Sequence, residues 1–255
     1  MKISFIGSGR VATHLACAFK KVGHEIFQIY SPHHAQQLAH KVNAVAIDQL
    51  QRLDPEIDVL IIAVNDQAIA SIIKILPDSF KDVCVVHTSG STDLKVLTEH
   101  HANSGVLYPL QTFSFEKEVV WADVPLLIEG NTTQGLSHIH SLANSLSKKI
   151  YHYSSTQRLN LHLAAVFACN FSNYCYDMAN QITEQAEIDF SLLHPLILET
   201  ANKATQFTPR EVQTGPAKRH DQNILALHQQ LLEQQNLPDL LDVYQQMSQG
   251  IEKHA

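Results

Sequence analysis

The sequence predicts an α/β fold, in which an N-terminal Rossmann domain with a mostly parallel, doubly wound sheet precedes an all-α C-terminal domain. Through about residue 150, short apolar runs alternate with amphipathic stretches, as in βαβ units. A glycine motif follows the first apolar run directly. From about Ser154 onward, strand-like runs give way to helical periodicity. We therefore expect one domain at residues 1–153 and a second at residues 154–255.

The elements of the first domain can be placed in chain order. The expected strands are residues 3–7, 25–30, 59–64, 83–87, 106–108, 125–128 and 150–153. The expected helices are residues 11–22, 36–41 and 134–146. The runs at 59–64 and 83–87 are almost wholly apolar and rich in β-branched residues, which is typical of central strands covered on both faces. Gly23 is expected to end the first helix.

The second domain is expected to contain only helices. Its periodic segments are residues 156–186, 192–204, 222–235 and 237–253. Asp221 directly precedes the third of them and can cap its N-terminus.

The glycine motif indicates a dinucleotide-binding turn. It has the form G-x-G-x-x-A and lies between the first strand and the first helix. Gly7 permits a tight turn, Gly9 lets the backbone approach a pyrophosphate, and Ala12 allows close packing of helix on strand. The helix N-terminus supplies N–H donors to the phosphates. The predicted cofactor-binding residues here are Gly7, Ser8, Gly9, Arg10, Val11 and Ala12.

The end of the second strand favours NADP over NAD. NAD-specific domains carry an acidic residue there for the ribose hydroxyls. This chain has Ser31, His33 and His34 instead, which can donate hydrogen bonds to a 2′-phosphate, and Arg10 can add a cation. The alternative is that the two histidines are solvated loop residues.

Further candidates follow the next two apolar strands. Asn65 and the pair Thr88 and Ser89 are expected at the carboxyl edge of the sheet, where they can touch the nicotinamide-side ribose or a substrate. Gly90 indicates a special backbone conformation or a close approach. His87, the last residue of its strand, is either a packed core histidine or a proton donor to substrate.

Two segments of the helical domain are also candidates. Asn170 interrupts an apolar helix, so it either bonds neighbouring backbone or faces a ligand. The segment 214–221 brings Lys218, Arg219 and His220 together after a Gly-Pro pair. These are either solvated charges or groups that hold an anionic substrate.

The composition excludes several classes of function. The net charge of -7 offers no basic surface for nucleic acid. The four cysteines have no metal-binding spacing, so we expect reduced thiols and no metal site. No apolar run approaches the length of a membrane span, and the N-terminus leads straight into the glycine motif, so we expect a cytoplasmic protein with a small-molecule partner.

Five segments together resemble a known family. They are residues 7–12, 87–91, 108–113, 165–171 and 215–221. They are similar to bacterial Rossmann-like proteins with a helical C-terminal domain of unknown function, often described as deazaflavin-type NADP oxidoreductases. That family is similar in architecture to pyrroline-5-carboxylate reductase, ketopantoate reductase and the 6-phosphogluconate dehydrogenase-like group. The resemblance implies a homodimer formed through the helical domain and a substrate bound between domains.

The chain departs from its relatives at two places. Tyr108 stands where the family has a histidine before Pro-Leu, so that histidine's role does not carry over, and Tyr108 becomes a substrate-binding candidate. The segment 215–221 is basic where pyrroline-5-carboxylate reductases have a Gly-rich loop. The basic loop argues against proline synthesis and for an anionic substrate held by Lys218 or Arg219.

The leading hypothesis is therefore an NADP-dependent oxidoreductase that transfers hydride to or from a small, anionic carbonyl, imine or hydroxy compound. Its catalytic candidates are His87, Asn170 and His220. The alternative is a non-catalytic NADP-binding sensor, since a Rossmann domain alone warrants binding and not a reaction. A methyltransferase is disfavoured because no acid follows the second strand and no antiparallel strand is expected at the end of the sheet.

Overall fold

A computed structural model describes residues 1–254, which form two compact units. The first unit is Met1–Cys169, and the second starts at Asn170. All elements from Ser155 onward are helical, so the change from strands to helices falls where the sequence predicts it. The first of these helices nevertheless belongs by its contacts to the sheet-containing unit.

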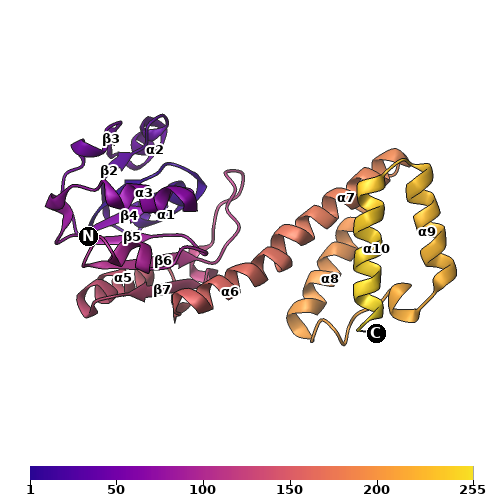
Figure 1. The fold of residues 1–255 in the computed structure, drawn as a ribbon. Coiled ribbons are helices and arrows are strands. Elements are labelled where there is room, and N and C mark those ends of the chain that lie inside the picture. Colours follow the sequence, from indigo (N-terminus) through magenta and orange to yellow (C-terminus); the bar gives the residue numbers. More distant parts are fainter. Residues whose placement is uncertain (255) are drawn as a thin grey trace. The chain divides into compact units, whose positions relative to one another are not determined.

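The first unit is built on an eight-stranded sheet (Figure 1). Its order is β3-β2-β1-β4-β5-β6-β7-β8. The strands are β1 (Lys2–Ile6), β2 (Glu25–Tyr30), β3 (Val45–Ile47), β4 (Val59–Ile62), β5 (Cys84–His87), β6 (Ser104–Pro109), β7 (Leu126–Gly130) and β8 (Ile150–His152). The mostly parallel Rossmann sheet predicted from the sequence is confirmed.

The far end of the sheet corrects one expectation. β7 pairs antiparallel with β6, and β8 runs parallel to β7. The expected absence of an antiparallel strand was therefore wrong, because strand direction depends on the connection between strands and not on their composition. The missing acid after β2 is the remaining argument against a methyltransferase.

Six α-helices also belong to the first unit, Met1–Cys169. They are α1 (Arg10–Lys21), α2 (Ala35–Val42), α3 (Asp66–Lys74), α4 (Lys95–Thr98), α5 (Thr133–Leu146) and α6 (Ser155–Ala165). The sequence did not predict β3, α3 or α4. Two of these are very short, and the third, α3, has nine residues and begins four residues after the end of β4.

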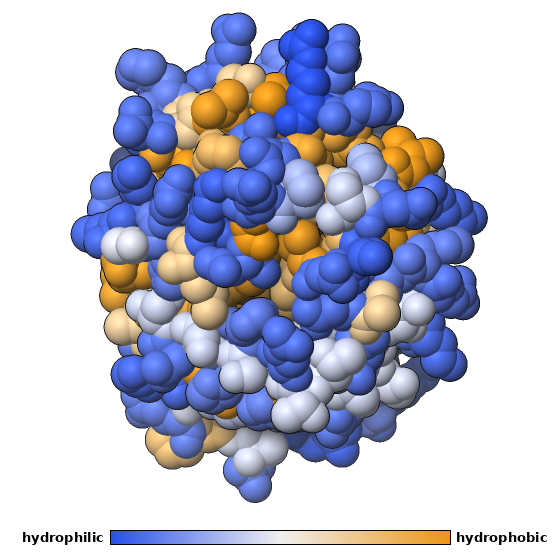
Figure 2. All heavy atoms as spheres, turned by 90° about the vertical axis from the view of Figure 1, so that its left-hand side faces the viewer, coloured by the Kyte–Doolittle hydropathy of each residue, from blue (hydrophilic) through white to orange (hydrophobic). Residues whose placement is uncertain are grey.

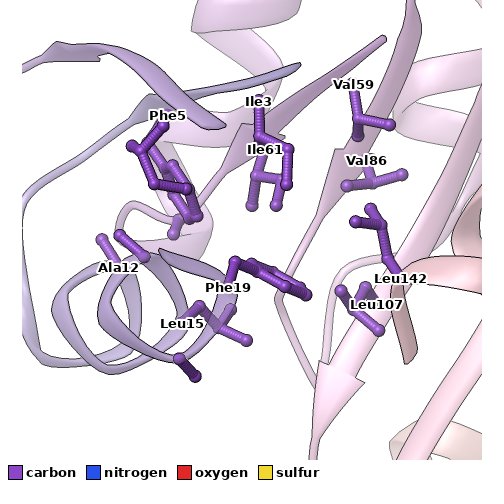
Figure 3. Packing of buried hydrophobic residues seen from close by; sticks show 14 of the residues in the cluster. Ile3, Phe5, Ala12, Leu15, Phe19, Val59, Ile61, Val86, Leu107 and Leu142 are labelled. Atoms are coloured by element: carbon purple, nitrogen blue, oxygen red, sulfur yellow. The ribbon is translucent and has the colours of Figure 1, made fainter. Parts of the chain in front are cut away.

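The core lies between the sheet and its helices. Every residue of β4 and β5 is buried, as their uninterrupted apolar composition predicts. On one face, Phe19 and Leu15 of α1 reach toward the side chains of the central strands, and Ala12 lies next to Phe5 (Figure 3). A residue larger than alanine at position 12 would push α1 away from β1.

The second unit contains α7 (Ser172–Gln185), α8 (His194–Gln206), α9 (Gln222–Gln234) and α10 (Pro238–Glu252). A π-helical segment, Val166–Phe171, joins α6 to α7, so the predicted helix at 156–186 is continuous but changes its hydrogen-bonding pattern in the middle. Asp221 caps α9 by accepting a hydrogen bond from Ile224 N. The small core of the second unit comprises Met178, Leu232 and Leu240.

Three properties of the surface and side chains bear on function. The face at the left of Figure 1 is mostly hydrophilic, with hydrophobic residues in separate patches (Figure 2). Within residues 1–254, no helix has the length and apolar character needed to cross a membrane. All four cysteines are free thiols, and the described residues contain no cluster of three or more potential metal ligands.

Candidate dinucleotide site

The turn after β1 requires glycine at its first position. Gly7 has φ +114°, a conformation that L-residues rarely adopt. A Cβ atom on Gly7 would lie 2.2 Å from the carbonyl oxygen of Ala63, at the end of β4. Gly7 therefore lets the turn lie directly against the neighbouring strand.

The next glycine leaves open space for a ligand. Gly9 is the N-cap of α1 and has φ −73°, and no atom lies within 4 Å of the position of its Cβ. No side chain caps the helix, and its first turn carries no acidic residue. The first backbone N–H groups of a helix have no intrahelical acceptor, so this N-terminus can bind an anion.

A cavity of about 620 Å³ lies above this helix N-terminus. It unites candidates that are far apart in the sequence, from the turn after β1 and from the ends of β2, β4 and β5. The candidates that line it are Gly7, Ser8, Gly9, Arg10, Val11, Ser31, Asn65, Thr88 and Ser89. Ala12 is buried beneath it, and His33 is exposed outside the lining.

Besides Ala63 and Val64, which directly follow β4, four residues that the sequence analysis did not assign to this cavity also line it: Asp66, Gly90, Phe115 and His162. Gly90 had been noted for a close approach, and the structure shows what approaches it: His162 of α6. The other three gave no sequence signal. Asp66 opens an unpredicted helix, Phe115 lies in a loop, and His162 lies between two leucines in a helix.

Hydrogen bonds hold the loops after β4 and β5 together at the cavity. Ser91 Oγ donates to the carboxylate of Asp66. Ser89 Oγ accepts from the backbone N–H groups of Ser91 and Thr92. The Ser89 side chain thus shapes its own loop, while its backbone remains at the cavity wall.

His87 lies behind this loop and is fully buried. Its Nδ1 accepts a hydrogen bond from Ser89 N at 3.1 Å. Burial, helped by the nearby Arg158 guanidinium, lowers the pKa of His87 to about 3, so the ring is neutral near pH 7. This geometry favours the packed core alternative over direct proton donation.

A buried arginine, Arg158, forms a hydrogen bond to the loop after β5. Arg158 of α6 is 1 % exposed and forms an ion pair with Glu129 of β7. It also donates to the carbonyl oxygen of Thr92 and to Ser155 Oγ. Ser155 Oγ in turn accepts from Leu94 N. The start of α6 is therefore bound to the loop that lines the cavity, which explains why it belongs to the first unit.

The loop of residues 111–120 lies along α1. Ser114 O is 2.7 Å from His14 Nε2, and the Arg10 guanidinium lies 5.9 Å from the centre of the Phe115 ring. Phe115 also lines a second cavity of about 350 Å³, together with His34 and Lys41. Cationic and polar side chains thus lie close to the expected position of an adenosine 2′-phosphate.

The remaining candidates are distributed over both units. Tyr108 of β6 is half-buried and does not line the cavity itself. Asn170, Lys218, Arg219 and His220 belong to the second unit, and their roles stay predictions. Asn170 is exposed within the π-helical segment, and His220, at φ 53°, has its Nδ1 3.9 Å from Glu252.

Comparison with known proteins relates this architecture to oxidoreductases. A Bacteroides fragilis protein described as a candidate NADP oxidoreductase is 35% identical over 99% of this chain and 98% of its own, with a TM-score of 0.93. An imine reductase from Myxococcus stipitatus in complex with NADP+ is 14% identical over 99% and 94% of the two chains, with a TM-score of 0.71. The NADP-bound pyrroline carboxylate reductase of Plasmodium falciparum is 12% identical over 100% and 99%, with a TM-score of 0.60.

The last two similarities show the shared fold alone. No curated protein matches the chain in sequence. Two family models match it: a Rossmann-like domain over residues 1–111, and a domain of unknown function, DUF2520, over residues 124–251. The chain therefore belongs to the family of Rossmann-like proteins that carry the DUF2520 domain.

Proposed function

We propose that this protein is an NADP-dependent oxidoreductase that transfers hydride to or from a small, anionic carbonyl, imine or hydroxy compound. The observation that carries the proposal is the cavity above the uncapped N-terminus of α1, where the glycine turn and the ends of β2, β4 and β5 converge. Such convergence at the carboxyl edge of a parallel sheet is the usual place for a dinucleotide.

The residues present fit NADP. The open space beside Gly9 and the free N–H groups of α1 suit a pyrophosphate. Ser31 lines the cavity after β2, with no carboxylate beside it to repel a 2′-phosphate, and Arg10 and His34 lie near. Bound NADP would supply or accept the hydride, and the chain's own residues would position it.

A similar protein from Bacteroides fragilis supports NADP as the cofactor. The Bacteroides fragilis protein, at 35% identity, is described as a candidate NADP oxidoreductase, and the imine and pyrroline carboxylate reductases with this fold were seen with NADP bound. For the substrate, Lys218 and Arg219 are cations suited to a carboxylate or phosphate, and Asn170 and His220 remain catalytic candidates.

We include in the proposal a homodimer formed through the helical unit. The described part of this unit leaves several large apolar side chains exposed, among them Leu192 at 71% and Leu198 at 64%. A second copy covering them would remove that surface from water. Light scattering of the purified protein tests this, with a monomer at all concentrations as the contrary result.

The test of the function uses two measurements on one preparation. NADPH is expected to raise the thermal midpoint more than NADH does, and replacing Ser31 and His34 by alanine should remove that preference. NADPH oxidation is then followed with cyclic imines and 2-oxo acids. Turnover supports the enzyme, whereas selective NADPH binding without turnover of any compound favours the sensor alternative.

A further inference from the structure

Two side chains meet at one end of the cavity without having been linked by sequence. Tyr108, on β6, and His162, on α6, are 54 residues apart. The Tyr108 hydroxyl lies 3.1 Å from His162 Nδ1, and the rings meet edge to face at 77°. His162 lines the cavity, and Tyr108 lies behind it.

The loop after β5 is shaped to admit this pair. A Cβ atom on Gly90 would lie 2.7 Å from His162 Nδ1 and 2.9 Å from Tyr108 Cζ. Any other residue would force the pair away from the loop. The absence of a side chain at position 90 is thus matched to the imidazole and phenol that occupy its place.

The position of the pair corresponds to the reactive half of a bound dinucleotide. The glycine turn takes the pyrophosphate and the end of β2 takes the adenosine ribose, so the loops after β4 and β5 face the nicotinamide. His162 shares the cavity wall with Ser89 and Gly90 of the β5 loop. A substrate beside the nicotinamide would therefore lie within reach of the imidazole.

The hydrogen bond determines which ring nitrogen is free. Tyr108 engages Nδ1, and the described residues provide no hydrogen-bond partner for Nε2. Burial, together with the charge of Asp66, raises the pKa of the Tyr108 hydroxyl, so it remains a neutral phenol. A neutral phenol can hold Nδ1–H of an imidazolium and leave Nε2 to exchange a proton with a ligand.

We infer that His162 is the proton donor of the reaction and that Tyr108 is its positioning residue. The inference rests on the proposed function. The substrate carbon accepts a hydride, with its electron pair, from NADPH, which becomes NADP+, and the C=N or C=O π bond breaks. The substrate nitrogen or oxygen takes the proton from His162 Nε2. The imidazole left behind keeps Nδ1–H on the Tyr108 oxygen and regains its proton from water.

Several other titratable or charged side chains lie near Tyr108 and His162, but none is placed as His162 is. Asp66 of α3 lines the cavity, and Arg158 precedes His162 by four residues on α6, with Cys169 also near Tyr108. His87 is fully buried with its Nδ1 engaged by Ser89. Among the described histidines, only His162 lines the cavity.

The kinetic test compares His162→Gln with His140→Gln, an exposed histidine on α5 outside the cavity lining. The probe is 1-pyrroline-2-carboxylate, an anionic cyclic imine, with NADPH. His162→Gln should lower kcat by about 10²–10⁴-fold, remove the limb of the pH profile that reports the acid, and leave the Kd for NADPH within about threefold. Tyr108→Phe should keep KM and shift that limb. Equal kcat in His162→Gln and His140→Gln would overturn the inference.

A second readout does not depend on turnover. In ¹⁵N NMR of the whole protein, His162 should show protonated Nδ1, and its Nε2 signal should respond to added NADP+ while that of His140 does not. Tyr108→Phe should mix the two tautomers. If the wild type binds NADPH but reduces none of the cyclic imines and 2-oxo acids, the proposed reaction fails. In that case, a His162 Nε2 signal that does not change on addition of NADP+ would refute the inference as well. A signal that changes would still identify Nε2 as the nitrogen that faces the bound ligand.

Discussion

In the first unit, α1 buries five of its twelve residues against the sheet, whereas α8 in the second unit, a helix of thirteen residues, buries none. Both sequences are amphipathic. The strands of the first unit provide α1 with a complete apolar surface. The second unit provides only the small core around Met178, Leu232 and Leu240.

This difference separates two functions of apolar residues. Those of α1 stabilise the fold of a single chain and thereby fix the N-terminus that faces the cavity. Those of α8 contribute little within one chain, and in the proposed homodimer a second copy would cover them. A pattern alone cannot distinguish the two cases, because it does not show what lies opposite the apolar face.

The largest effect is expected in the core of the first unit. Phe19→Ala should lower the free energy of unfolding by about 3–5 kcal/mol, because it removes a fully buried ring and leaves a cavity. Leu198→Ala, at an exposed position of α8, should change it by less than about 0.5 kcal/mol in dilute solution. Urea denaturation measures both, and equal losses would remove the contrast between the units.

A smaller but clear effect is expected at the buried ion pair. Glu129→Ala leaves the Arg158 guanidinium buried without its counter-charge, so the free energy of unfolding should fall by about 3 kcal/mol. The matched control is Asp123→Ala, which removes the carboxylate of the exposed pair with Lys149. That loss should stay below about 1 kcal/mol. Equal losses in the two variants would contradict the anchoring role of Arg158.

A pH effect is expected from His87. Its pKa of about 3 in the fold lies below the value of about 6.5 in the unfolded chain, so below pH 6.5 the unfolded state binds a proton that the folded state excludes. Stability should therefore fall as pH drops from about 6.5, with a slope of at most one proton. His87→Asn, whose side-chain oxygen can still accept from Ser89 N, should have a flatter profile; an identical slope would refute the buried neutral ring.

Local sequence pattern was sufficient to predict most strands, the glycine turn and most helices. The apolar composition of a strand such as β4 predicts that it is buried, and Gly7 and Gly9 belong to a motif that can be recognised within a few residues of sequence. Contacts between distant segments were not predictable in this way. The pair Tyr108 and His162 and the pair Glu129 and Arg158 exist because β6, β7 and α6 meet in space. The antiparallel direction of β7 was missed for the same reason.

The central claim is that the glycine turn at the start of α1 binds a dinucleotide, and calorimetric titration of NADPH into three proteins tests it most directly. Gly9→Ala introduces a methyl group into open space, so the fold should keep its stability while NADPH binding weakens at least about tenfold. Gly7→Ala should lose stability by about 1–3 kcal/mol, because of its positive φ and its contact with Ala63. The account predicts tight binding by the wild type and weak binding by folded Gly9→Ala. Equal affinity of these two proteins, or no binding by the wild type, would contradict it.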